Sequence, residues 1–151
     1  MTRRRATSKS DACCRIGRST AGLGLFATAP IRRGAFIVEY SGERIPTREA
    51  KARERAMGAR YMFEINGRWT VDGSPRSNIG RYANHFCRPN AESAVSNGKV
   101  ILRALQAIEP GEEITYDYGP EYFELFIKPN GCRCAKCTED AMARRAKKRR
   151  A

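Results

Sequence analysis

The sequence has no long hydrophobic run, and its 151 residues include a single histidine and a single tryptophan. Its apolar stretches extend over only a few residues, as in Phe36-Ile37-Val38. A transmembrane helix and a secretory signal peptide both need a long apolar block, so neither is expected. No coiled-coil, collagen-like or longer internal repeat is visible. Hydrophobic residues nevertheless make up 41% of the chain and charged residues 30%, a composition typical of one globular domain with its own core.

Acidic residues are missing from both ends of the chain, and this imbalance sets the net charge. In total, 29 Lys and Arg face 16 Asp and Glu, which gives +13. Residues 1–10 hold four of the cations and residues 141–151 hold six, so the remaining body carries only +3. Because runs of like charge stay solvated, we expect residues 1–12 and 139–151 to be flexible basic arms. Such arms increase solubility, bind nucleic acid nonspecifically or act as a nuclear-import-like run.

The charge has the opposite sign in residues 109–124, which contain six acids and no Lys or Arg. An acidic segment inside a basic protein suits a cationic peptide partner better than a phosphate backbone.

The local pattern predicts short strands with tight turns and one helix. Phe36–Tyr40 is rich in β-formers between two glycines, and Thr47–Met57 has an N-cap residue followed by good helix formers. Asn66-Gly67 and Asn97-Gly98 are hairpin signals, and Pro110-Gly111 is a turn signal. The fold class is therefore mainly β, a β-rich α+β single domain.

The six cysteines are unevenly distributed. Without a signal peptide, a disulfide framework is disfavoured. Residues 132–137 read C-x-C-x-x-C, a spacing that lets three thiolates converge on one Zn²⁺, which takes four tetrahedral ligands. The fourth ligand must come from elsewhere, and the candidates are Cys87, Cys13, Cys14 and His85.

Four motifs carry the strongest functional signal because of their order and spacing. They are Gly22-Leu23-Gly24 followed by Glu39-Tyr40-Ser41-Gly42-Glu43, the run RYANHFCRPN over residues 81–90, the run GEEITYDYG over residues 111–119, and the cysteine cluster 132–137. Together they resemble the SET-domain protein lysine methyltransferases with a short post-SET zinc segment.

The resemblance implies a SET-domain fold of small curved β-sheets over residues 16–119, with one short helix, and a zinc-binding post-SET segment over residues 120–138. It also implies a C-terminal pseudoknot, a rare threaded connection that brings Asn84-His85 beside Tyr116 and Tyr118. Two departures stand out. Phe86 replaces the family's usual serine, and the cysteine cluster is more compact than the usual spacing.

The resemblance also assigns roles to individual residues. It implies that Tyr118 is the catalytic tyrosine, that Tyr116 lines the lysine channel, and that Tyr61 contacts the lysine or the cofactor. The cofactor would be S-adenosylmethionine, with S-adenosylhomocysteine as the product. Its implied binding residues are Gly22, Leu23, Gly24, Tyr61, Arg81, Asn84, His85 and Phe123. The implied ligands of a structural Zn²⁺ are Cys87, Cys132, Cys134 and Cys137.

The expected function is S-adenosylmethionine-dependent methylation of a lysine in a histone or another basic protein tail, with monomethyl-lysine as the main product. One alternative is a DNA- or chromatin-binding protein without catalysis, and another is a methyltransferase of a non-histone protein. The expected location is intracellular, at chromatin in a eukaryotic nucleus or a host nucleus and otherwise in the cytoplasm.

Overall fold

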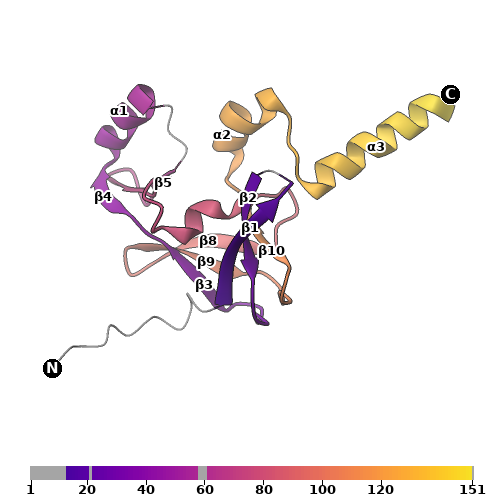
Figure 1. Cartoon of the computed structure of the whole chain (residues 1–151). Helices are drawn as coiled ribbons and strands as arrows, with labels where there is room; N and C mark the ends of the chain where they lie inside the picture. The colour runs from indigo at the N-terminus through magenta and orange to yellow at the C-terminus, as the bar shows by residue number, and fades with distance from the viewer. Residues whose placement is uncertain (1–12, 21, 58–60, 151) are drawn as a thin grey trace.

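Three small β-sheets make up the body of the molecule, and three helices lie at its periphery (Figure 1). The computed structural model describes residues 13–20, 22–57 and 61–150. The predicted basic arm at residues 1–12 lies outside this range, as does Gly58, the residue that follows the predicted helix. Among the described residues no helix combines the length and the apolar character that crossing a membrane requires.

The first sheet has four strands in the order β1-β2-β10-β7. Its strands are β1 (Cys14–Ser19), β2 (Gly22–Ala27), β10 (Glu113–Tyr116) and β7 (Asn84–His85). The β10 strand pairs antiparallel with β2 and parallel with β7, where Thr115 faces Asn84 and Tyr116 faces His85. A segment near residue 115 thus lies between strands formed near residues 25 and 84, which is the juxtaposition that the predicted pseudoknot requires.

The second and third sheets have three strands each. One has the order β3-β9-β8, from β3 (Phe36–Tyr40), β9 (Lys99–Ala104) and β8 (Ala91–Ser96). The other has the order β4-β6-β5, from β4 (Glu43–Pro46), β6 (Trp69–Asp72) and β5 (Met62–Glu64). A short 3-10 turn, η2 (Ile79–Tyr82), leads into β7.

The main core lies where the first two sheets meet. Its fully buried side chains come from strands of both sheets and from the loop before β10, and the largest are Leu25, Ile37, Leu102, Ile108 and Ile114. Burial of these five side chains stabilises the fold by about 8–15 kcal/mol before chain entropy is subtracted, at roughly 1.5–3 kcal/mol each. This core fixes the strands that carry the site.

Both predicted hairpins are present. Asn97 and Gly98 have positive φ angles of 50° and 73°, as a type I′ turn requires, and Ser96 pairs with Lys99 across them. At the other hairpin the Asn66 Oδ1 accepts hydrogen bonds from the backbone N–H groups of Arg68 and Trp69, both at 2.9 Å. Strands β5 and β6 flank this turn and pair across it, with Glu64 opposite Thr70.

Helix α1 (Thr47–Met57) has the predicted bounds and is tied to the third sheet by Arg53. The Arg53 guanidinium pairs with Glu49 one turn earlier, with Glu43 on β4 and with Asp72 on β6, at 2.7, 3.2 and 2.9 Å. The Thr47 hydroxyl donates to the carbonyl of Asn66 at 3.2 Å, which joins the start of the helix to the hairpin.

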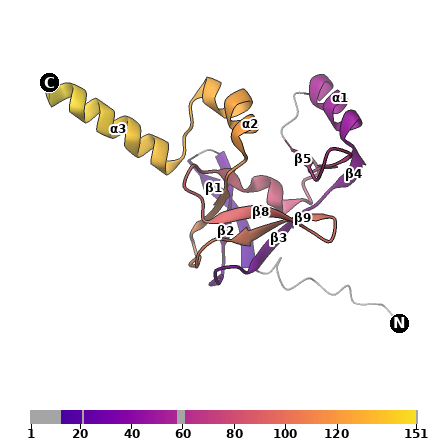
Figure 2. The same cartoon turned by 180° about the vertical axis from the view of Figure 1, so that it is seen from behind.

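The chain after β10 departs from expectation. It forms the short α2 (Pro120–Tyr122), a π-helical turn η3 (Phe123–Ile127), a 3-10 turn η4 (Lys128–Asn130) and the long α3 (Ala135–Arg150). The sequence pattern predicted one helix, at Thr47–Met57, whereas residues 139–150 of the expected basic arm are also helical in the structure. Alanine, lysine and arginine are strong helix formers, and cations in the last turn interact favourably with the helix dipole. The helix extends away from the body (Figures 1 and 2).

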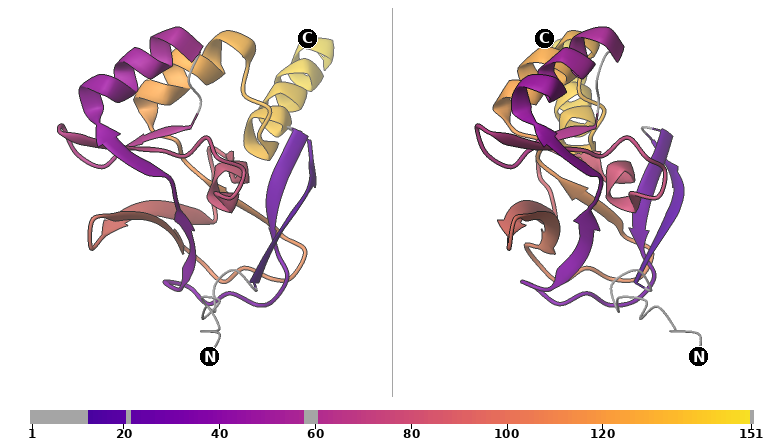
Figure 3. Two further views of the ribbon diagram at one scale, coloured as in Figure 1. Left: turned by 60° about the vertical axis from the view of Figure 1, so that its left-hand side comes forward. Right: turned by 90° about the vertical axis from the view of Figure 1, so that its left-hand side faces the viewer.

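Two of the helices flank one end of the molecule. Helix α1 and the α2–η3 segment lie beside each other above the sheets, as the two views in Figure 3 show. The space between them is lined by side chains from both, together with residues of β5 and β6.

Candidate active site

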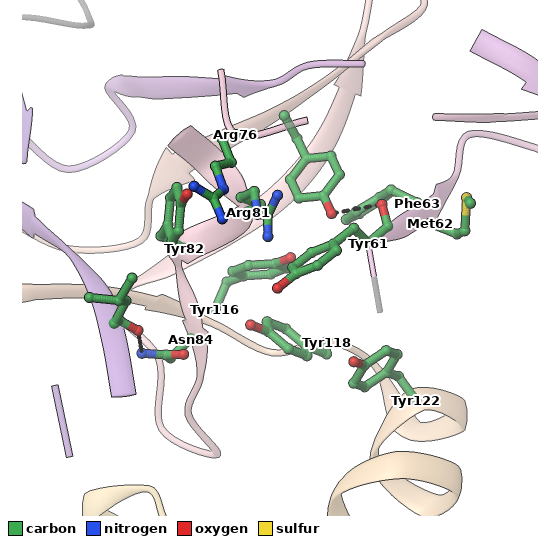
Figure 4. Close-up of a pocket in the computed structure, with 12 residues that line it drawn as sticks. Tyr61, Met62, Phe63, Arg76, Arg81, Tyr82, Asn84, Tyr116, Tyr118 and Tyr122 are labelled. Atoms are coloured by element: carbon green, nitrogen blue, oxygen red, sulfur yellow. Dashed lines mark hydrogen bonds between the residues drawn. The ribbon is translucent and has the colours of Figure 1, made fainter. Parts of the chain in front are cut away.

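A pocket of about 660 Å³ opens where the first and third sheets face each other (Figure 4). This volume is in the range of small-molecule and cofactor sites. Its lining is unusually rich in tyrosine and includes no carboxylate: Leu23, Tyr40, Tyr61, Met62, Phe63, Arg76, Arg81, Tyr82, Asn84, Tyr116, Tyr118 and Tyr122. The structure thus gathers the predicted residues Tyr61, Arg81 and Asn84 around the tyrosines of the C-terminal motif.

Tyr116 and Tyr118 are held side by side, with ring centroids 4.7 Å apart. The Tyr118 hydroxyl donates to the carbonyl of Ala83, and its backbone N–H donates to the His85 Nδ1 at 3.1 Å, so this residue is fixed at both ends. Burial raises the pKa of the hydroxyls of Tyr116 and Tyr118 above the ordinary tyrosine value. Both hydroxyls therefore stay protonated at neutral pH and act as hydrogen-bonding groups with fixed positions.

Asn84 links the glycine motif to the central strand. Its Nδ2 donates to the Leu23 carbonyl at 2.9 Å and to the Glu113 Oε1 at 2.8 Å. A Cβ atom on Gly24 would lie 2.5 Å from that same carboxylate oxygen, so a side chain there would displace Glu113. Gly22 has a φ of 110°, which favours glycine. Gly24 thus lets β2 approach the Glu113 carboxylate that binds Asn84, and Gly22 allows the backbone turn at the start of the strand.

His85 is a structural neighbour of the pocket. Burial lowers its pKa below the usual value, and the Asp117 carboxylate, 3.7 Å from Nδ1, opposes this shift. A neutral ring that accepts the Tyr118 N–H on Nδ1 carries its proton on Nε2, which lies 3.5 Å from the Cys87 sulfur. The His85 ring also packs against Phe123, with centroids 5.5 Å apart, so the predicted residue Phe123 lies beside the asparagine-histidine pair.

Phe86, which departs from the family motif, faces a second cavity. Its backbone N–H donates to the Tyr116 carbonyl at 3.3 Å and so continues the pairing of β7 with β10. Its side chain lines this cavity together with His85, Leu125 and Phe126. The phenyl group therefore contributes apolar lining between β7 and the C-terminal segment.

Four of the cysteines converge. The sulfur atoms of Cys87, Cys132, Cys134 and Cys137 all lie within 4.8 Å of one another. Cys87 is 3.8 Å from Cys132 and 3.6 Å from Cys137. A tetrahedral ion with metal–sulfur distances of about 2.3 Å separates its ligands by about 3.8 Å, so this donor set fits Zn²⁺. Of the four candidates for the fourth ligand, the structure brings Cys87 to the cluster.

The environment of Cys134 favours a thiolate. Burial alone raises a thiol pKa, but the backbone N–H groups of Cys87 and Cys137 interact with the Cys134 sulfur and lower its pKa to about 7. One of these contacts, from the Cys137 N–H, measures 3.5 Å. Thiolates are the form that binds metal.

A groove with a volume of about 460 Å³ adjoins the pocket between α1 and the α2–η3 segment. The two cavities share Met62, Phe63, Tyr118 and Tyr122. Three carboxylates line the groove, from Glu54, Glu64 and Glu121. Burial raises the pKa of Glu54, the neighbouring charge of Lys51 opposes this shift, and the charges of Glu121 and Glu64 add to it.

Sequence reasoning missed several residues that shape the pocket. Tyr40 donates from its hydroxyl to the Tyr61 carbonyl at 2.8 Å. Tyr122 packs edge-on against Tyr118, with centroids 5.1 Å apart. Arg76 lines the pocket from the loop after β6. Tyr40 belongs to the motif at residues 39–43, whereas Arg76 and Tyr122 lie outside the four motifs of the sequence analysis.

Comparisons with known proteins agree with this geometry. A family model described as the SET domain matches residues 22–119. The histone-lysine N-methyltransferase trithorax of Drosophila melanogaster is 37% identical over 124 residues, which cover 77% of this chain and 3% of that protein. An H3 lysine-4 specific histone-lysine N-methyltransferase of Candida albicans is 35% identical over 104 residues, covering 63% and 10%.

Solved structures of Polycomb Repressive Complex 2 are similar in fold. A humanized mutant of the Chaetomium thermophilum complex bound to the inhibitor GSK126 has a TM-score of 0.63 and 32% identity, covering 70% of this chain and 15% of that chain. The autoinhibited ctPRC2 bound to S-adenosylmethionine has a TM-score of 0.64 and 30% identity, covering 71% and 15%. The chain thus spans about a tenth or less of the two curated relatives and about 15% of each of these solved chains.

Proposed function

Because the chain belongs to the SET-domain family, we propose that it is a protein-lysine N-methyltransferase that uses S-adenosylmethionine. The observation that carries this proposal is the fixed position of Tyr118, whose hydroxyl and backbone N–H are both engaged at the junction of the tyrosine-rich pocket and the groove. The relatives named as histone-lysine N-methyltransferases support the same reaction class.

The pocket offers suitable contacts for the cofactor. Nε of Arg81 is buried and has no hydrogen-bond partner among the described residues, so a polar group of a bound molecule is expected there. When bound, S-adenosylmethionine supplies an electrophilic methyl group on its sulfonium. We assign its binding to Gly22, Leu23, Gly24, Tyr61, Arg81, Asn84, His85 and Phe123, as the sequence predicts.

The chemical task of this chain is to present a neutral amine in line with that methyl group. Free lysine has a pKa near 10.4, so about one amine in a few thousand is neutral at pH 7. The buried ring of Tyr116 and the partly buried ring of Tyr118 would exclude water from the amine, and desolvation favours its neutral form. Positioning then provides most of the acceleration, since the hydroxyls remain protonated and remove no proton themselves.

A basic protein tail is the substrate that the groove fits best. The groove combines apolar lining from Met62, Phe63 and Leu125 with three carboxylates and one cation, which come from Glu54, Glu64, Glu121 and Lys51. The charge of the groove is therefore negative. Cationic residues next to the target lysine would be attracted by these carboxylates and would relieve their mutual repulsion. A histone tail has this character, and in a eukaryotic cell or a host nucleus such a substrate implies work at chromatin.

Monomethyl-lysine is the product that we propose as the main one. Tyr116 is 6% exposed, and its hydroxyl occupies the space beside the reacting amine. A methylated amine would have to displace a water held by that hydroxyl and rotate before a second transfer, which disfavours dimethylation.

We propose that the cysteine cluster binds one structural Zn²⁺. Cys87, Cys132, Cys134 and Cys137 fill all four tetrahedral positions, so no position is left open for a substrate or water. The ion would join the C-terminal segment to the loop after β7 and hold Phe123 and its neighbours over the asparagine-histidine pair.

A second candidate function is nonspecific binding of nucleic acid or chromatin without catalysis. The observation that favours it is the exposed end of α3, where residues 144–150 carry six cations and no acid. Phosphate backbones bind such segments in a strongly salt-dependent way.

One assay separates the two candidates. The purified protein is incubated with labelled S-adenosylmethionine and a panel of basic proteins, and a Tyr118→Phe variant serves as the matched control. Transfer by the unaltered chain and little transfer by the variant support the methyltransferase. The absence of transfer to every protein, with salt-sensitive DNA binding retained, would favour the binding protein.

A further inference from the structure

Helix α1 forms one wall of the groove but packs on the body through few apolar contacts. The side chains of this helix that line the groove are Thr47, Ala50, Lys51 and Glu54. Their spacing places them on one face of the helix. Ala50 is the one buried apolar side chain of the helix among those that the structure describes, and a single methyl group contributes little hydrophobic stabilisation. Polar contacts must therefore determine where this wall stands.

Polar contacts attach the helix to the third sheet at two points. At its start, the Thr47 hydroxyl lies 3.0 Å from the Thr70 hydroxyl on β6. In its second half, the Arg53 guanidinium donates to Asp72 on β6 at 2.9 Å and to Glu43 on β4 at 3.2 Å. Within the described ranges, no other side chain in the second half of the helix forms a salt bridge. The second half of α1 is thus held on the sheet mainly by Arg53.

Asp72 is a firm anchor for this arginine. It is buried on the central strand of the third sheet, and its Oδ1 accepts a hydrogen bond from the Ser74 N–H at 3.1 Å. In the register of the sheet it stands opposite Met62, which lines both the pocket and the groove. A charge-assisted bond to a buried carboxylate is stronger than an exposed ion pair. Arg53 therefore ties the helical wall to the strands at the junction of the two cavities.

The charges inside the groove act against this attachment. Glu54 on α1 interacts unfavourably with Glu121 on the opposite wall and with Glu64, and the Lys51 ammonium opposes this effect. Like charges on facing walls repel each other and push the helix away from the α2–η3 segment, which lies beside it in Figure 3. None of the three carboxylates that bind Arg53 lines the groove, so its ion pairs hold the helix from the other side.

We propose that Arg53 is a positioning residue that holds α1 at the separation from the α2–η3 segment at which the groove binds a basic peptide. This inference rests on the proposed function, in which the groove binds the residues next to the target lysine. Arg53 lines neither cavity, so it acts through Glu54 and the other side chains of the groove face. Its loss should weaken peptide binding and spare the chemistry, because Tyr116 and Tyr118 are held by β10 and β7.

Three variants test the role of Arg53. Arg53→Gln removes all of its ion pairs, and Arg53→Lys keeps one charge that can still reach Asp72. Arg55→Gln is the matched control, because Arg55 lies on the same helix, is exposed, lines neither cavity and forms no salt bridge within the described part of the chain. Fluorescence anisotropy measures the affinity for a labelled lysine peptide flanked by arginines, with S-adenosylhomocysteine present. Single-turnover transfer at saturating peptide measures the chemistry, and calorimetry measures the affinity for S-adenosylhomocysteine alone.

The expected result for Arg53→Gln is a roughly tenfold loss of peptide affinity, the size of effect typical for one charge-assisted hydrogen bond. The transfer rate and the affinity for S-adenosylhomocysteine should stay within about twofold, and hydrogen exchange should become faster in α1 and stay unchanged in β10. Arg53→Lys should recover part of the peptide affinity, and Arg55→Gln should bind the peptide as the unaltered protein does.

Glu43→Gln keeps the test decisive if Arg53→Gln does not fold. It removes an exposed partner of Arg53 and should weaken peptide binding by about twofold in the same direction. Unchanged peptide affinity in the Arg53 and Glu43 variants, an equal loss in Arg55→Gln, or a parallel loss of affinity for S-adenosylhomocysteine would overturn the positioning role. Failure of the unaltered protein to transfer a methyl group to any basic protein or peptide would instead refute the proposed function.

Discussion

Two regions of the molecule differ in the burial of their side chains. One is the body, up to residue 119, and the other is the C-terminal segment, residues 120–150. The body contains the aliphatic core around Leu25, Leu102 and Ile114, which are fully buried. In the segment, Cys134 is the one buried side chain among the described residues, while Leu125 is 63% exposed and Met142 64% exposed. Hydrophobic burial holds the body together, whereas the segment is anchored by aromatic contacts and by its cysteines.

The two regions also contribute differently to the candidate active site. The body supplies Tyr116, Tyr118 and the strands that fix them, so its contribution is rigid. The segment supplies one wall of the groove and the rings of Tyr122 and Phe123, and none of its described side chains belongs to the hydrophobic core. Changes at Tyr116 and Tyr118 should therefore act on chemistry, and changes in the segment should act on binding.

The largest effect is expected in the body, from Tyr118→Phe. Removal of a hydroxyl that is fixed by its bond to the Ala83 carbonyl should lower the rate of methyl transfer by about 100-fold, the size seen when one preorganised polar group is lost. Single-turnover transfer to a lysine peptide measures it. A rate within a few-fold of the unaltered protein would show that this hydroxyl has no part in the reaction.

The second-largest effect is expected on the zinc content of the cysteine cluster, from Cys87→Ser. Loss of one of four thiolate ligands should strongly reduce the zinc content, because the remaining three cannot complete the tetrahedron. The thermal midpoint of the body should change little, since its core is untouched. Metal analysis measures the stoichiometry, with Cys14→Ser as the control that keeps the ion. An unchanged, tightly held ion would place the fourth ligand elsewhere, with Cys13 or Cys14 as the next candidates.

A smaller effect, on product rather than rate, is expected from Tyr116→Phe. Removal of its hydroxyl frees space beside the amine, so the variant should add more methyl groups per lysine and keep most of its activity. Mass spectrometry of the modified peptide distinguishes the products. Tyr40→Phe is the matched control, because the Tyr40 hydroxyl is already donated to the Tyr61 carbonyl. Ready formation of trimethyl-lysine by the unaltered protein would contradict the role of Tyr116.

The smallest effect on chemistry is expected from removal of residues 141–151. These residues follow Cys137 in α3, and those that the structure describes are all exposed, so transfer to a short peptide should stay within about twofold. Nucleic-acid binding should weaken, and its salt dependence should flatten, because six cations are lost. A large loss of transfer to the short peptide would mean that the end of α3 helps to build the site.

Local sequence signals predicted the hairpins and helix α1 but not how these elements are arranged. Asn97-Gly98 predicted its hairpin because positive φ angles leave few other residue choices, and Thr47–Met57 had the composition of a helix. The parallel pairing of β7 with β10 joins residues about thirty apart, and no local pattern encodes that contact. It was predicted only through the family resemblance.

The residues of the candidate site likewise divide into those that stand in sequence motifs and those that do not. Tyr116, Tyr118, Asn84 and Cys87 stood in recognisable motifs, and the structure brings them to one region. Arg76 was missed because it stands in a turn whose residues reach the pocket only after the loop packs against Tyr40. The helix at residues 139–150 was missed because charge repulsion was weighed and the high helix propensity of alanine, lysine and arginine was not.

The position of Cys87 has a consequence for how β10 is kept in place. Cys87 lies two residues after β7, its partner sulfurs come 45 to 50 residues later, and β10 lies between them in the sequence. An ion bound to all four sulfurs would close that stretch into a ring that contains β10. While the ring is intact, a β10 strand that separates from β2 and β7 would remain tethered close to them, so it would pair again quickly. Metal release would then raise the rate at which this arrangement is lost, so the ion would slow the unfolding of the whole molecule.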